Sequence, residues 1–141
     1  MDERQAASDL FTAIAGEAPF DGLVDVTLNA TVLEGMGECT VEWSRDGDRE
    51  TGRTPRSALR IIRELRKDMA TPQGGAWFTA KFVWTPAGEY RATFDYDSRP
   101  QWRMGVDPDS ERRMIIEDFE AFPRSPEATP EWLSDIINSD K

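Results

Sequence analysis

The 141-residue sequence contains no histidine and a single cysteine, Cys39. Without histidine, a Ser-His-Asp or Cys-His nucleophilic site, a histidine-ligated zinc site and a histidine general base are all excluded. One cysteine can form neither an internal disulfide nor a thiolate zinc cluster, and it fits a reducing compartment. No GxxxxGKS/T or GxGxxG phosphate loop is present either. An enzyme would have to work with carboxylates alone, so we predict a protein that is not an enzyme, with no catalytic residues and no cofactor.

The sequence also lacks an apolar run of about 18 residues, which a membrane-spanning helix requires, and a basic-then-apolar start of the secretory type. We therefore expect a cytoplasmic protein. Basic residues are few: 17 Lys and Arg stand against 27 Asp and Glu, which gives a net charge of -10. Phosphate binding needs clustered basic side chains, so this balance argues against nucleic acids and anionic membranes and favours a basic partner.

Alternating apolar and polar residues predict four strands, and apolar residues at helical spacing predict four helices. The strands are expected at 24–32, 39–44, 77–84 and 90–97, and the helices at 3–16, 55–69, 111–122 and 130–138. Two hairpins joined through a helix make a mostly antiparallel sheet whose helices pack on one face. We predict a single α+β domain over residues 1–141, with a four-stranded sheet and the order α-β-β-α-β-β-α-α.

The connections between these elements carry weaker signals. Residues 19–22 are expected to form a turn, and the polar residues 45–54 are either a hairpin extension or an exposed loop. Thr54, which precedes Pro55, is expected to cap the second helix.

Two acidic runs place oxygen atoms at alternate positions, as a calcium-binding loop does. They are 46–50 (DGDRE) and 107–111 (DPDSE). Neither continues to the glycine and the distant bidentate glutamate that such a loop requires. Solvated turns, with Asp109 or Ser110 capping a helix, are the better interpretation, and we predict no metal site.

Several polar side chains should share the sheet face that the helices leave open. They are Asp25, Thr27, Glu42, Lys81, Arg91, Thr93, Asp95 and Asp97. Asp95 and Asp97 lie two residues apart at a strand end, where they are either simply solvated or contact a basic partner. Trp77 and Trp102 fall outside the core pattern beside carboxylates, where tryptophan is typical of an interface, although core packing is equally open. The candidate partner-binding residues are Asp95, Asp97, Trp102, Asp25, Glu42 and Trp77.

A basic stripe follows the second helix through Arg56, Arg60, Arg63 and Lys67. Spacings of three and four residues suit a phosphate-binding surface, but they are also typical of a solvated helix face. We favour the solvated face, because exposed ion pairs with nearby carboxylates are sufficient to accommodate these side chains.

Five short segments follow one another along the chain: 75–78 (GAWF), 93–97 (TFDYD), 117–120 (EDFE), 122–124 (FPR) and 130–133 (PEWL). Together, in this order, they resemble the YezG-like antitoxins. The resemblance covers roughly the C-terminal half of the chain, while the first half agrees in pattern only. It implies an immunity protein that binds the catalytic domain of a cognate secreted bacterial toxin and blocks its active site.

The charge balance independently agrees with such a role. A nuclease toxin must be basic to hold phosphates, and an acidic inhibitor complements it. The free protein would be a monomer or a homodimer. The alternative is an acidic secretion chaperone, which would bind an extended segment of an exported client and not a folded catalytic domain.

Overall fold

The computed structural model describes residues 1–18, 22 and 24–139, so most of the turn predicted at 19–22 lies outside the described residues. The helices are α1 (Glu3–Ala15), α2 (Arg56–Met69), α3 (Pro108–Ala121) and α4 (Glu131–Asn138), with a short 3-10 helix at Pro126–Ala128. The strands are β1 (Asp25–Leu33), β2 (Met36–Arg45), β3 (Asp48–Gly52), β4 (Thr79–Trp84) and β5 (Tyr90–Asp95). No helix among the described residues is both long and apolar enough to cross a membrane.

The five strands form one antiparallel sheet in the order β3-β2-β1-β4-β5. The predicted α+β class is confirmed, but the prediction of four strands is wrong because β3 extends the first hairpin. Apolar alternation does not reveal β3, because most of its residues are exposed. Its position is set by pairing with β2. Gly52 ends it against the indole of Trp43, where any Cβ would overlap the ring.

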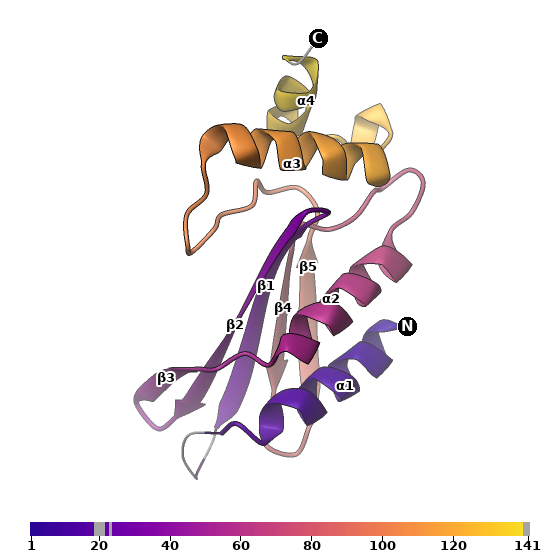
Figure 1. The fold of residues 1–141 in the computed structure, drawn as a ribbon. Helices are drawn as coiled ribbons and strands as arrows, with labels where there is room; N and C mark the ends of the chain where they lie inside the picture. The colour runs from indigo at the N-terminus through magenta and orange to yellow at the C-terminus, as the bar shows by residue number, and fades with distance from the viewer. Residues whose placement is uncertain (19–21, 23, 140–141) are drawn as a thin grey trace.

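A main core lies between one face of the sheet and helices α1 and α2, which lie side by side across it (Figure 1). The apolar residues of β1 alternate toward this side. The larger fully buried members of the core include Leu28, Trp43, Phe82 and Trp84 from the sheet and Leu10, Ile14, Ile62 and Leu65 from the helices. The Trp84 indole N–H also donates to the Ala7 carbonyl oxygen at 3.1 Å, which fixes α1 on β4.

The C-terminal helices do not join this layer. Helices α3 and α4 lie across the end of the sheet at the β1–β2 turn (Figure 1). They enclose a second apolar cluster built on Leu33, Phe78, Ile115 and Leu133. The prediction that all helices pack on one face is therefore wrong for α3 and α4.

A buried ion pair connects the two parts of the structure. Both guanidinium Nη atoms of Arg66, on α2, donate to the carboxylate of Asp118, on α3, at 2.7 and 2.9 Å. Arg66 Nε also donates to the Trp77 carbonyl oxygen at 2.6 Å, and Asp118 accepts the backbone N–H of Glu34 at 2.8 Å. Arg66 is 2% exposed and Asp118 is 4% exposed. Each charge is therefore shielded from water and needs the other to offset the cost of its burial.

A second buried arginine, Arg124, holds the chain after α3. Its Nη atoms donate to the carbonyl oxygens of Tyr96 at 2.6 Å and Ala76 at 2.8 Å, and its guanidinium lies over the Phe78 ring. Burial lowers the pKa of Arg124. Gly75 makes room for it: the glycine has φ +69°, and a Cβ there would lie 2.6 Å from Arg124 Cγ.

Two predicted helix caps are wrong. Pro55 occupies the N-cap position of α2, while the Thr54 hydroxyl donates to the Cys39 carbonyl oxygen at 3.1 Å. Asp107, and not Asp109 or Ser110, caps α3 by accepting the Ser110 N–H at 3.0 Å.

Substituting one partner of the buried ion pair tests its importance. We expect Asp118→Ala to lower the free energy of unfolding by about 3–5 kcal/mol, because it leaves Arg66 buried without a counter-charge. Glu117→Ala, at the exposed neighbouring position on α3, is the control and should change it by less than about 0.5 kcal/mol. Urea unfolding of both variants measures the difference, and equal stability would show that the pair does not hold α3 to α2.

Gly75→Ala should destabilise the protein by about 2 kcal/mol or more, because it combines a left-handed backbone with displacement of Arg124. Gly105→Ala is a matched control: Gly105 has φ +73° and nothing within 4 Å of an added Cβ, so only the backbone cost remains. Thermal or urea unfolding gives both values. If the two substitutions cost the same, Arg124 does not need the space that Gly75 leaves.

Candidate partner-binding site

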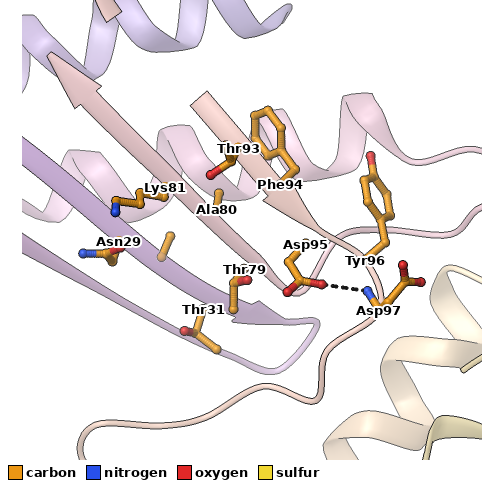
Figure 2. Close-up of a pocket in the computed structure, with 11 residues that line it drawn as sticks. Asn29, Thr31, Thr79, Ala80, Lys81, Thr93, Phe94, Asp95, Tyr96 and Asp97 are labelled. Carbon is orange, nitrogen blue, oxygen red and sulfur yellow. Dashed lines mark hydrogen bonds between the residues drawn. The ribbon is translucent and has the colours of Figure 1, made fainter. Parts of the chain in front are cut away.

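The sheet face opposite α1 and α2 is the candidate site. Two rows of side chains cross strands β1, β4 and β5 of this face. From β1 through β4 to β5 the rows are Asn29, Lys81 and Thr93, and then Thr31, Thr79 and Asp95. They line an open depression of 580 Å³, with Asp97 at one end (Figure 2). The alternation of the strands sends Phe94 and Tyr96 to the helix side, where they pack against the main core. The open face therefore presents hydroxyl, amide and charged groups on a rigid support.

Asp95 and Asp97 make the acidic end of the depression. Asp95 Oδ1 accepts the backbone N–H groups of Asp97 and Ser98, each at 2.9 Å (Figure 2 shows the first). The Ser98 bond is the main cause that lowers the pKa of Asp95, and burial only partly opposes it, so the carboxylate stays charged at neutral pH. The Asp97 carbonyl oxygen accepts the Trp132 indole N–H at 2.6 Å, so α4 helps to fix this end.

A smaller depression of 220 Å³ continues the open face toward the start of β1. It contains two other candidates, Asp25 and Glu42, together with the basic side chains of Arg49, Lys81 and Arg91. Arg49 Nη1 donates to Glu42 Oε1 at 3.0 Å, so this carboxylate is already paired. The charge in this depression is mixed, whereas the Asp95–Asp97 end is acidic.

Trp77 does not lie on the open face. It is fully buried, with its ring centroid 5.5 Å from that of Phe94, and so it is not part of a contact surface. The reason is a break in the alternation at Phe78. The Phe78 N–H donates toward β5, to Asp95, while its carbonyl oxygen accepts from Val32 on β1. In a regular strand both groups face the same neighbour, so the side chains change phase here and Trp77 turns to the helix side.

Trp102 is half-buried and packs against the second apolar cluster. The backbone N–H of the next residue, Arg103, donates to Glu38 Oε1 at 2.8 Å. Glu38 lies opposite Thr31 in the sheet, so this loop borders the second row of the open face. Trp102 thus supports the edge of the site, while the neighbouring Met104 is 87% exposed.

The basic stripe on α2 divides between two roles. Arg56, Arg60 and Lys67 are exposed, as expected of a solvated face. Arg63 is half-buried, and its Nη1 donates to the carbonyl oxygens of Leu33 and Glu34, each at 3.2 Å. It therefore holds the β1–β2 turn.

Sequence reasoning missed the structural roles of Arg66, Asp118 and Arg124. A signal existed for Arg66, since it follows Ile62 by four residues and so falls on the buried side of α2. Asp118 and Arg124 belong to the EDFE and FPR segments. Those two segments of the antitoxin resemblance therefore serve, through these residues, to attach α3 and the chain after it to the rest of the fold.

Metal and thiol chemistry have little support in the described residues. They contain no group of three or more Cys, Asp or Glu side chains arranged to hold a metal ion. Glu111, from the second acidic run, instead pairs with Arg99 at 2.7 Å. Burial raises the pKa of Cys39 to about 12, which keeps the thiol protonated and unreactive at neutral pH.

Neither the comparison with protein-family models nor the comparison with curated proteins gives a match for this chain.

Proposed function

We propose that this chain is an immunity protein that binds the folded, basic catalytic domain of a bacterial toxin and blocks its active site. The observation that carries the proposal is the open sheet face, a rigid polar surface with a charged acidic end at Asp95 and Asp97. The resemblance to YezG-like antitoxins supplies the class of partner, and the physical properties of the face support it.

Exposure of one sheet face is by itself ordinary in antiparallel sheets. The charge pattern is the more specific feature. Asp95 and Asp97 lie at one end of the face, while the other depression holds both acidic and basic side chains. An acidic end beside a region of mixed charge favours one orientation of a partner over others and penalises partners with the wrong pattern. A basic cleft that normally holds phosphates fits the Asp95–Asp97 end.

The overall charge supports rapid association with a basic partner. A net charge of -10 attracts a basic domain from a distance, and steering of this kind raises association rates toward about 10⁸ M⁻¹s⁻¹ at low salt. An immunity protein has to act before its toxin reaches the substrate, so fast capture suits this role.

The position of the acidic end depends on the C-terminal part of the chain. Arg124 holds the Tyr96 carbonyl and Trp132 holds the Asp97 carbonyl. These contacts fix the backbone on which both carboxylates stand, so little ordering remains to be done on binding. We infer that the C-terminal segments contribute to partner binding indirectly, by positioning the acidic end of the face.

Capture with tagged protein from the producing cells, followed by mass spectrometry, is the direct test. We expect a tightly held protein whose folded C-terminal domain binds at one to one. Capture of flexible segments only, from several exported proteins, would contradict the proposal and support the secretion chaperone.

A charge-neutralising double variant tests the location of the site. Asp95→Asn with Asp97→Asn should slow association with the toxin domain by about tenfold at low salt and flatten its salt dependence, because it removes the acidic end. Asp109→Asn with Glu117→Gln removes the same charge from the exposed side of α3 and is the control. Surface plasmon resonance at two salt concentrations gives the rates. Equal slowing in both double variants would exclude a specific role for the Asp95–Asp97 end.

A further inference from the structure

β5 is an edge of the sheet, since among the described residues it pairs only with β4. The Asp95 carbonyl oxygen accepts the Phe78 N–H, so the backbone groups of Asp95 face β4. Backbone groups alternate in direction along a strand, and those of Arg91 and Thr93 therefore face β4 as well. The N–H and C=O groups of Tyr90, Ala92 and Phe94 face outward, where they are free to pair with another strand.

The two edges of the sheet differ in their protection against such pairing. The outer strand β3 has the sequence DRETG, with residues Asp48 to Thr51 exposed and charged or polar. Charged, short edge strands discourage association. β5 instead has the sequence YRATFD, and Ala92, Phe94 and the following Tyr96 are only half-buried on the helix side. These apolar side chains are therefore only partly covered by the described part of the chain.

β5 is complementary to itself when two copies run antiparallel with Thr93 opposite Thr93. On the open face, Arg91 of each copy then lies opposite Asp95 of the other, which gives two opposite-charge pairs. On the helix side, Ala92 lies opposite Phe94, and Tyr90 lies opposite Tyr96. Ala92 and Phe94 are both residues with outward backbone groups, so they form hydrogen-bonded pairs in this register.

We propose that two copies of this chain associate through their β5 edges in this register, so that their sheets become one continuous antiparallel sheet. The two-fold axis is perpendicular to the sheet, which places both open faces on one side and joins them into a single surface. The Tyr96 carbonyl is already bound to Arg124, so the shared ladder ends there and the interface is small. Small interfaces are typical of weak, transient complexes, so we expect a dimer that forms only at high protein concentration. This proposal does not rest on the proposed function.

Sedimentation velocity from about 1 µM to 1 mM tests the dimer, with folding checked by circular dichroism. Arg91→Glu places like charges opposite Asp95 twice and should raise the dimer Kd by at least about tenfold. Arg60→Glu makes the same charge change on the exposed side of α2 and should leave the Kd within about twofold. A wild-type chain that remains monomeric at 1 mM, or equal effects of both variants, would overturn the proposal.

Mixing two variants provides a stricter test of the register. Asp95→Arg alone places Arg91 opposite an arginine, and it should weaken the dimer as Arg91→Glu does. In a mixture of the two variants, both cross-strand positions again hold opposite charges. We expect the mixture to form a heterodimer with a Kd near that of wild type. If each variant is folded and the mixture stays monomeric, the proposed register is wrong.

Hydrogen exchange distinguishes a second copy from a toxin segment on the same edge. The amides of Ala92 and Phe94 should become protected as the free protein is concentrated. Protection that appears only when the toxin domain is added would overturn the dimer and assign the edge to the toxin. Toxin affinity measured at nanomolar protein, where the chain is monomeric, tests the proposed function separately.

Discussion

The ion pair between Arg66 and Asp118 is the constraint on which the arrangement of the two parts of this fold depends. Both side chains are almost fully buried, and together with the Trp77 carbonyl and the Glu34 N–H they satisfy one another's hydrogen bonds. A buried pair of this kind contributes little net stability compared with apolar packing, but it strongly penalises arrangements that separate the charges. The pair therefore specifies where α3 lies against α2 and against the β1–β2 turn.

This constraint extends to the candidate site through the chain that follows α3. Arg124 enters the space that Gly75 leaves and binds the carbonyl oxygens of Ala76 and Tyr96. Trp132 then binds the carbonyl oxygen of Asp97. The acidic end of the open face is thus held by two residues, Arg124 and Trp132, that do not line the depression. Separating support from contact in this way allows a surface to be rigid without using its own side chains for packing.

Much of the sheet could be predicted, because successive side chains of a strand point to opposite faces and the sequence therefore indicates which side chains share a face. The open-face positions of Thr27, Lys81, Thr93 and Asp95 follow directly from it. β3 could not be found this way, because an edge strand that is exposed on both sides carries no apolar period. Trp77 was misplaced because one irregular residue, Phe78, changes the phase of the strand. The role of Asp118 was missed because a charged residue on a helix is usually solvated, and only the tertiary fold brings Arg66 to it.

The resemblance to the antitoxins acquires a physical interpretation from these contacts. Its segments include Trp77, Asp118, Arg124 and Trp132. Trp77 lies in the core, Asp118 belongs to the buried ion pair, and Arg124 and Trp132 donate hydrogen bonds to backbone carbonyl oxygens. Side chains used in this way specify the fold, whereas Thr93, Asp95 and Asp97 of the 93–97 segment line the open face. Under the proposed function, recognition of one toxin over another comes from side chains that the fold does not need. The exposed open-face row of Asn29, Lys81 and Thr93 is such a set. In the proposed role, the sheet face determines which partner is bound, while the C-terminal segments hold that face in a fixed form.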